Sequence, residues 1–237
     1  MKTYKIHLIR HGATQGNLEG RYIGVTDLGL CEEGRAELET LRDQFEYPYA
    51  QKVYASPLRR CVETAGILYP DHHVQTVDGL REYDFGDFEG LTMRELQEDL
   101  AFVEWMKSNM AVAPPHGEEK ADFDERMRAG FEEVLKDMMH EGITAAAVVT
   151  HGGVIMGLLS MLGLPKRNPL EWIVGNGKGY TVATSSYLWS NANLVEVYDP
   201  LPYGADDYRE ARGYAVFDLP EDEDTTDDGE DGTAQWQ

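Results

Sequence analysis

Hydrophobic residues along the chain gather in short continuous runs, and stretches with helical spacing separate these runs. Residues 4–9, 52–55 and 145–150 are apolar runs of strand length, and the last of them carries no charged residue. Such a run is typical of a strand buried inside a parallel sheet. Residues 180–188 and 194–198 predict two further strands, the second with alternating apolar and polar positions.

Helical periodicity marks the segments between these strands. Residues 32–45 place apolar side chains on one face, and residues 93–109 and 121–140 do the same. Thr92 is expected to cap the helix that follows it. The apolar stretch 154–162 predicts a further helix. Strands that alternate with helices in this way indicate an α/β fold.

Turn chemistry marks the start of one more helix and two loops. Ser56 is a suitable N-cap and Pro57 suits a first helical turn, so a helix is expected through about Leu68. Residues 13–30 are rich in glycine and predict a long loop, and long loops in compact domains are usually functional. Residues 80–90 alternate acids, aromatics and glycines and predict an irregular, packed loop.

Size and composition narrow the classes of protein. The chain has 237 residues, of which 42% are hydrophobic, so it can bury a substantial core. It shows no internal repeat and no apolar run long enough to cross a membrane. Cys31 and Cys61 have neither metal-ligand spacing nor a disulfide framework. With no secretory pattern at residues 1–4, a cytoplasmic protein is expected.

The charge of the chain is strongly negative and unevenly distributed. A net charge of −22 argues against nucleic acid and anionic membranes as partners. Nine acidic residues and no basic ones lie between Asp218 and Asp231. We therefore predict one domain over residues 1–218, closed by a short strand at 216–217, and a disordered acidic tail over residues 219–237. An anionic substrate would need cations concentrated in one pocket.

Two of the predicted strands end in similar polar corners. Arg10-His11-Gly12 follows the first strand, and His151-Gly152-Gly153 follows the strand at 145–150. Ligands of open α/β sheets bind at the carboxyl ends of the strands. Two histidines that end parallel strands can meet there, so we place the candidate site at this edge.

Other candidate residues lie in the segments between the strands. Asn17 lies in the glycine-rich loop and can hydrogen-bond an anion, although asparagine is also common in turns. Arg59 or Arg60 begins a helix, where anions bind well, but two adjacent arginines also suit a solvent-exposed face. Glu82 is either a carboxylate of an acidic surface loop or one buried against aromatic rings, which would raise its pKa and suit it to acid catalysis.

The order of these motifs resembles that of the histidine phosphatase superfamily, also called the phosphoglycerate mutase-like family. The similarity covers about residues 4–165, with a weaker strand region to about residue 200. The matching segments are Ile9-Arg10-His11-Gly12-Ala13-Thr14 with Asn17, Gly24-x-x-Asp27-x-x-Leu30-x-x-x-Gly34, Ser56-Pro57-Leu58-x-Arg60-x-x-x-Thr64-Ala65, Leu80-x-Glu82-x-x-Phe85-Gly86-x-x-Glu89-Gly90, Gly117-Glu118 and Val149-Thr150-His151-Gly152-Gly153.

The resemblance implies a fold and a branch of the family. The fold is a three-layer α/β/α sandwich with a mostly parallel central sheet, as in phosphoglycerate mutases. The branch is that of α-ribazole phosphatases and broad-specificity phosphatases. Two positions depart from the family pattern, since Ala13 stands where Glu is common and Glu119 where Ser is usual. We expect both departures to affect peripheral contacts only.

The resemblance also implies a reaction and a role for each candidate residue. A small phosphorylated metabolite would be hydrolysed through a phosphohistidine on His11, with Glu82 as general acid and base and no metal or cofactor. The phosphoryl group would be bound by Arg10, Arg60, His151, Asn17, Gly24 and Gly152. Phosphoryl transfer depends mostly on positioning and charge stabilisation, which these groups supply.

Three alternatives stay open at this stage. A phosphoglycerate mutase would use the same residues but return the phosphoryl group to the substrate. A non-catalytic protein of the same fold would bind a phosphorylated ligand without turnover. A metallohydrolase could use His7, His11 and His151, although these lack the single-helix spacing of a zinc motif. The sequence names no substrate, and it leaves a homodimer open.

Overall fold

The computed structural model describes residues 2–205, and these form a mixed α/β fold around one seven-stranded sheet. Its strand order is β3-β2-β4-β1-β6-β7-β5. The pairings among β3, β2, β4 and β1 are parallel, as is that of β5 with β7, whereas β6 runs antiparallel to both of its neighbours. The strands are β1 Thr3–Arg10, β2 Lys52–Ala55, β3 Val74–Thr76, β4 Ala145–Thr150, β5 Gly163–Leu164, β6 Gly179–Ser185 and β7 Val195–Leu201.

Helices connect the strands and cover both faces of the sheet. Three short 3₁₀ turns at Asp78–Leu80, Gly86–Phe88 and Pro169–Trp172 complete the regular structure of the described residues. The helices are α1 Gln15–Leu18, α2 Glu32–Gln44, α3 Arg59–Leu68, α4 Met93–Leu96, α5 Leu100–Lys107, α6 Lys120–Glu141, α7 Gly152–Leu162 and α8 Ser186–Ala192.

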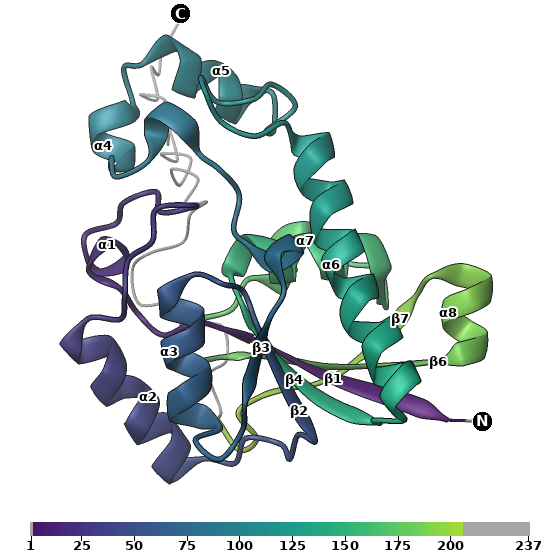
Figure 1. The fold of residues 1–237 in the computed structure, drawn as a ribbon. Coiled ribbons are helices and arrows are strands. Elements are labelled where there is room, and N and C mark those ends of the chain that lie inside the picture. The colour runs from purple at the N-terminus through teal and green to yellow at the C-terminus, as the bar shows by residue number, and fades with distance from the viewer. Residues whose placement is uncertain (1, 206–237) are drawn as a thin grey trace, which may run out of the picture.

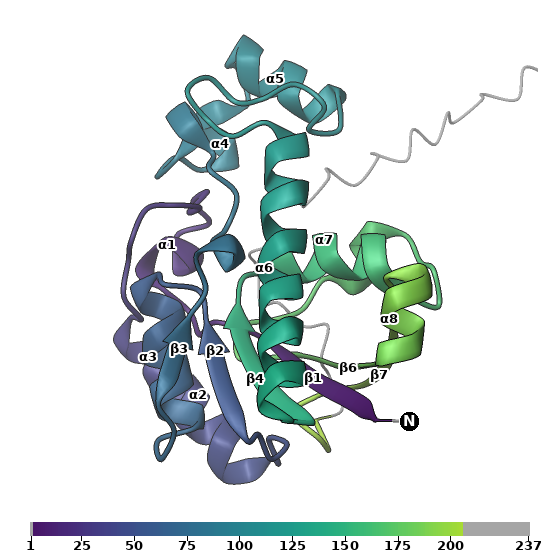
Figure 2. The same cartoon turned by 45° about the vertical axis from the view of Figure 1, so that its right-hand side comes forward.

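Alternation along the buried strands produces the three layers. In β4, Ala147 and Val149 pack with the buried residues of α2 and α3, whereas Ala146 and Val148 pack with those of α6 and α7. Successive side chains of a strand point to opposite faces, so one strand contributes to both clusters. Figures 1 and 2 show α2 and α3 on one side of the sheet and α6 on the other. The predicted α/β/α sandwich is confirmed.

The sheet register brings the two polar corners together. Strands β1 and β4 are parallel neighbours, and Arg10 at the end of β1 pairs with Thr150 at the end of β4. The next residues, His11 and His151, therefore leave the sheet side by side. Helices α4 and α5 lie beyond this region, next to the N-terminal end of α6 (Figure 1, Figure 2).

Several predicted boundaries agree with the structure. The strand at 52–55 and the end of a helix at Leu68 are as predicted. The helices predicted at 32–45 and 121–140 differ from α2 and α6 by one residue at their ends. Thr92 is an N-cap, because its side chain accepts a hydrogen bond from the Glu95 amide. Within residues 2–205, no helix combines the length and apolarity that a bilayer span requires.

The helix predicted over 93–109 is wrong as a single element. It is divided into α4 and α5, and the Asp99 carboxylate accepts hydrogen bonds from the amides of Ala101 and Phe102. A side chain that satisfies free amides in this way starts a new helix. The helical spacing of apolar residues continues across Asp99, so it gives no sign of the break.

Three other predicted boundaries are also wrong. Ser56 does not cap α3, because the helix begins at Arg59 after Leu58, and the Arg59 amide donates to the Asp27 carboxylate at 2.7 Å. The strand predicted over 180–188 ends at Ser185, whose hydroxyl accepts a hydrogen bond from the Leu188 amide and starts α8. The loop over 13–30 contains the short helix α1. The strand predicted at 216–217 and the acidic tail at 219–237 lie outside the described residues.

Candidate active site

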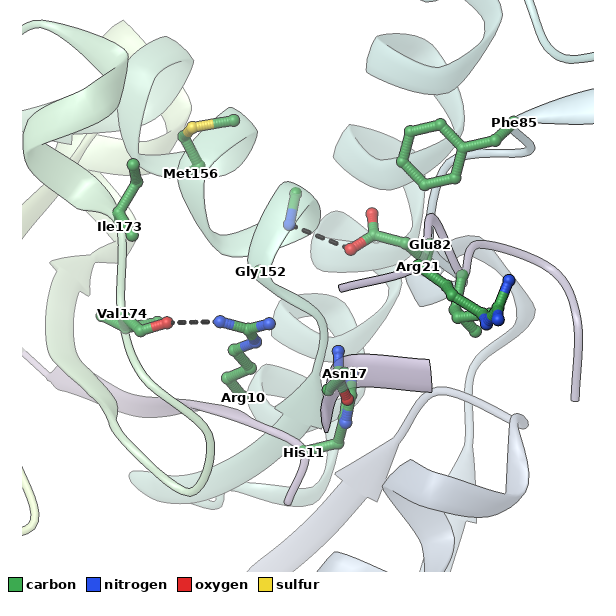
Figure 3. Close-up of a pocket in the computed structure, with 12 residues that line it drawn as sticks. Arg10, His11, Asn17, Arg21, Glu82, Phe85, Gly152, Met156, Ile173 and Val174 are labelled. Atoms are coloured by element: carbon green, nitrogen blue, oxygen red, sulfur yellow. Dashed lines mark hydrogen bonds between the residues drawn. The ribbon is translucent and has the colours of Figure 1, made fainter. Parts of the chain in front are cut away.

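A pocket opens at the carboxyl ends of β1 and β4, where the two polar corners lie. Its lining includes five of the predicted site residues, and Figure 3 shows side chains from β1, α1 and the 80–90 loop around one space. Those five residues are Arg10, His11, Asn17, Glu82 and Gly152. The pocket also contains Arg21, Ile23, Phe85, Gly153, Met156, Ile173 and Val174.

His11 is held as a neutral ring with one nitrogen free of protons. Its Nδ1 lies 2.7 Å from the Gly12 carbonyl oxygen, and because a carbonyl only accepts, Nδ1 carries the proton. Nε2 therefore keeps its lone pair. Burial lowers the pKa of His11 well below 6.5, and the nearby charges of Arg60 and Arg10 lower it further. A neutral imidazole with a free Nε2 is a competent nucleophile.

Arg10 is a buried cation with unused donors. Its side chain comes from the last residue of β1, and its Nη1 donates to the Val174 carbonyl at 2.8 Å. The Nε group is buried and has no hydrogen-bond partner among residues 2–205. A buried unpaired donor is costly, and a guanidinium binds an oxyanion through two parallel hydrogen bonds. Arg10 therefore places a buried guanidinium with unused donors in the pocket lining.

Glu82 lies across the pocket, tied to backbone amides. Its two carboxylate oxygens accept hydrogen bonds from the amides of Tyr83 at 2.9 Å and Gly153 at 3.0 Å, the second of which is visible in Figure 3. Burial raises the pKa of Glu82 above 4.5, while these amides, Arg60 and Arg10 oppose the rise. A Cβ atom at Gly153 would lie 2.5 Å from the carboxylate, so glycine is needed for this approach. A buried carboxyl with a raised pKa suits proton donation.

Arg60 and His151 lie in contact with the site but not in the pocket lining. Both are fully buried. Arg60 donates to the carbonyl oxygens of Gly24 at 2.6 Å and Thr26 at 2.9 Å, and its Nε donates to His151 Nδ1 at 3.3 Å. These bonds use three of the five N–H groups of a guanidinium. Arg59, by contrast, is exposed and pairs with Glu63.

His151 is fixed by partners on both ring nitrogens. Because its Nδ1 accepts from Arg60, its Nε2 carries the proton and donates to the Ser56 hydroxyl at 2.8 Å. Burial lowers its pKa well below 6.5, and Arg60 is the next largest cause. The centres of the His11 and His151 rings are 5.2 Å apart. The two histidines therefore touch, but only His11 lines the pocket.

Asn17 lines the pocket, whereas Gly24 does not and contacts Glu89. Asn17 Oδ1 accepts hydrogen bonds from the amide and the hydroxyl of Thr14, each at 3.0 Å, and these bonds do not involve its NH₂ group. The Gly24 amide donates to Glu89 at 2.9 Å, and the amides of the next two residues donate to the same carboxylate. Glu89 thus occupies the backbone cradle predicted near Gly24.

Some contributors were missed because no local pattern marks them. Ser56 was interpreted as a helix cap, but it binds His151 from 95 positions away in the chain. Glu89 was matched to a motif, yet its contact with residues 24–26 carried no signal in the sequence. Arg10 is held by the Val174 carbonyl. Every residue has a backbone carbonyl, so the sequence does not show which one binds Arg10.

The metallohydrolase alternative requires a group of side chains that can bind a metal ion. Across residues 2–205, no three His, Cys, Asp or Glu side chains lie together as a metal site requires. The His7 ring is hydrogen-bonded to the Thr181 hydroxyl at 3.0 Å. Burial lowers the pKa of His7 to about 4, with Lys5 as a further cause.

Comparison with known proteins identifies the family. The family model of the histidine phosphatase superfamily, branch 1, matches residues 6–195. The chain belongs to this superfamily. It is 28% identical to the adenosylcobalamin/alpha-ribazole phosphatase of Escherichia coli over 178 residues, which cover 73% of this chain and 86% of that protein.

Further relatives support a phosphatase role. The chain is 28% identical to phosphoserine phosphatase 1 of Hydrogenobacter thermophilus over 151 residues, which cover 62% of this chain and 70% of that protein. The crystal structure of the alpha-ribazole phosphatase from Shigella flexneri superimposes with a TM-score of 0.66 at 25% identity, covering 82% of this chain and 94% of that one. These relatives are named for different substrates, so the superfamily alone does not name a substrate for this chain.

Proposed function

We propose that the protein hydrolyses a small phosphomonoester, with His11 as the nucleophile. The state of the His11 ring supports this proposal, because its proton is fixed on Nδ1 and its Nε2 lone pair is available in a pocket that Arg10 also lines. In the first step Nε2 attacks phosphorus, the bond from phosphorus to the ester oxygen breaks, and a phosphohistidine forms.

Arg10 supplies the main positive charge for the phosphoryl oxygens. Its guanidinium lines the pocket next to Gly152, and the N–H groups that do not bind the Val174 carbonyl are the donors that we assign to the phosphoryl oxygens. Gly152 also begins α7, whose N-terminus favours negative charge. Asn17 adds amide donors. Arg60 does not line the pocket, but it contacts His151 and its positive charge acts on His11, so it adds to the charge that stabilises the phosphoryl group.

Glu82 supplies and then removes the proton. In the protonated form, which its raised pKa favours, it donates to the departing alkoxide. The resulting carboxylate then takes a proton from water, which attacks the phosphohistidine and releases inorganic phosphate. The two half-reactions together restore His11 and Glu82 to their starting states. The proposed chemistry uses no metal, so EDTA should leave the activity unchanged.

The variant Glu82→Gln separates the two half-reactions. With p-nitrophenyl phosphate the leaving phenolate needs little protonation, so we expect a rapid burst of one equivalent of p-nitrophenolate followed by slow turnover. The slow phase should be about 10²–10⁴-fold below wild type, the usual contribution of a general acid–base group. Rapid-quench labelling with ³²P should show an alkali-stable phosphoenzyme that accumulates in this variant and is absent from His11→Ala.

Other outcomes would contradict the proposal. Full multiple turnover in His11→Ala would exclude this nucleophile. Transfer of phosphate between the positions of a phosphoglycerate, with no release of inorganic phosphate, would assign the chain to the mutases. Binding of phosphorylated compounds with no phosphoenzyme in any variant would indicate a non-catalytic protein of the same fold.

A further inference from the structure

A second cavity adjoins the phosphate pocket on the Glu82 side. It has a volume of about 370 Å³ and is lined by residues of α5, α6 and α7, by the segment 82–85 and by residues 168–170 at the 3₁₀ turn Pro169–Trp172. The two spaces adjoin, because both are lined by Glu82, Phe85, Gly153 and Met156. The volume lies in the range of cavities that enclose a small organic molecule.

The proposed chemistry directs the alcohol part of the substrate into this cavity. The departing oxygen must lie opposite the attacking nitrogen of His11 and within reach of the proton on Glu82. Whatever the oxygen carries must therefore extend past Glu82. The cavity is the space on that side which shares Glu82 with the phosphate pocket.

The lining of the cavity is mostly apolar and rich in methionine. Four methionines reach it from three parts of the chain, together with two phenylalanines and Leu170. Methionine side chains are flexible and polarisable, and they adapt to apolar or aromatic groups of irregular shape. The polar contributions of Asn109, Ser160 and Asn168 are uncharged. The methionines are Met106, Met110, Met156 and Met161.

The charges around the cavity are already paired. Lys120 at its edge forms an ion pair with Asp124, one turn further along α6. Arg21 in the phosphate pocket pairs with Glu19 and Glu95. Within the described lining no cation is left over for a second anionic group, and the net charge of the chain is strongly negative. A carboxylate or second phosphate on the alcohol would lose its hydration without compensation.

The backbone after α5 is bent to present this lining. Asn109 and Met110 have φ values of +54° and +65°, in the left-handed region that residues other than glycine rarely adopt. The two residues turn the chain at the end of α5, and both line the cavity. Backbone strain of this kind is found mostly where a site requires it.

From these observations we infer that the substrate is a phosphate monoester of a bulky, uncharged, apolar or aromatic alcohol, whose apolar group fills this cavity. The inference rests on the proposed function, since it uses the position of Glu82 relative to the leaving oxygen. It distinguishes this chain from an enzyme for phosphoglycerates or bisphosphates, whose second anion the cavity does not neutralise.

A series of primary alkyl phosphates tests the inference with constant leaving-group chemistry. Ethyl, butyl, hexyl and 3-phenylpropyl phosphate differ only in apolar surface. We expect kcat/KM to rise by about fourfold for each methylene that enters the cavity, until the cavity is filled. A hexyl phosphate with a terminal carboxylate should fall at least roughly tenfold below hexyl phosphate, because its charge is desolvated unpaired.

A charge placed at the rim of the cavity should reverse this preference. Leu170 lines the cavity and is 44% exposed, so Leu170→Arg adds a cation there with little cost to folding. We expect the variant to favour the carboxylate-bearing ester over hexyl phosphate. Leu100→Arg is the matched control, because Leu100 is 84% exposed and is not part of the lining, and it should behave as wild type.

The outcomes separate this inference from the proposed function. Equal kcat/KM for ethyl and hexyl phosphate, with an intact His11-dependent phosphoenzyme, would overturn the inference and leave the proposed function standing. A preference of the wild type for the carboxylate-bearing ester would do the same. If no ester is hydrolysed and no phosphoenzyme forms, the proposed function fails and the inference fails with it.

Discussion

The two histidine corners have similar sequences and different surroundings. Each follows a buried strand, and each is followed by glycine. At the first corner the Gly12 carbonyl binds one nitrogen of His11 and the other nitrogen is left for chemistry. At the second, Ser56 and Arg60 bind both nitrogens of His151. This difference shows that the chemical role of a histidine at a strand end depends on which groups bind its ring nitrogens.

Replacement of each histidine should give the largest difference. We expect His11→Ala to lose at least about 10⁴-fold in kcat, because the nucleophile is gone. His151→Ala should still form the phosphoenzyme but lose about 10²–10³-fold, since it removes only an electrostatic and positioning contact. Steady-state assays with phosphoenzyme trapping measure both. A phosphoenzyme in His11→Ala that is missing from His151→Ala would reverse the assignment.

A third buried histidine should affect stability and not catalysis. His7 lies on β1 and its pKa is lowered to about 4, so between pH 6.5 and pH 4 the unfolded chain binds more protons than the folded one. Stability is therefore lost as the pH falls, by about 3 kcal/mol between pH 7 and pH 4 from this residue. Urea unfolding of wild type and His7→Asn measures it.

The pH dependence in that experiment isolates His7 from the two site histidines. The difference between wild type and His7→Asn should shrink toward low pH, while kcat at pH 7 stays the same in both. Parallel stability curves over this pH range would contradict the assignment.

The two glycines after His151 should tolerate alanine differently. A Cβ at Gly153 would lie 2.5 Å from the Glu82 carboxylate, whereas one at Gly152 has no contact closer than 3.4 Å, to Arg10. We expect Gly153→Ala to lower kcat by roughly 10–10²-fold, because the added methyl group displaces the general acid. Gly152→Ala should lower kcat less than Gly153→Ala does. Activity with an alkyl phosphate is the measurement. A larger loss in Gly152→Ala would contradict this order.

Loss of the Ser56 hydroxyl should have a smaller effect on turnover than loss of His11 or His151. Ser56→Ala leaves the Nε2 proton of buried His151 without its acceptor, which costs about 1–3 kcal/mol of stability. Because His151 then lacks its fixed orientation, we expect kcat to fall about tenfold, as for partners that orient a site residue. Thr in place of Ser56 should restore much of the activity. A fall in stability with unchanged kcat would assign Ser56 a structural role alone.

The sequence by itself determined the layers and the position of the site. The short apolar run 145–150 indicates a buried strand, and the 3.6-residue period of α6 defines its buried face. Parallel strands align their carboxyl ends, so the sequence placed Arg10, His11 and Gly152 at one edge of the sheet, and the pairing of β1 with β4 brings them together there. Local periodicity carries this information because secondary structure forms through near neighbours.

Tertiary structure alone decided the details on which the chemistry depends. The partners of Arg60 and of His151 come from distant segments of the chain. The cavity beside Glu82 is of the same kind, because its methionines come from α5, α7 and the turn between α5 and α6. Burial and hydrogen bonding depend on which surfaces face each other, and no local pattern encodes that.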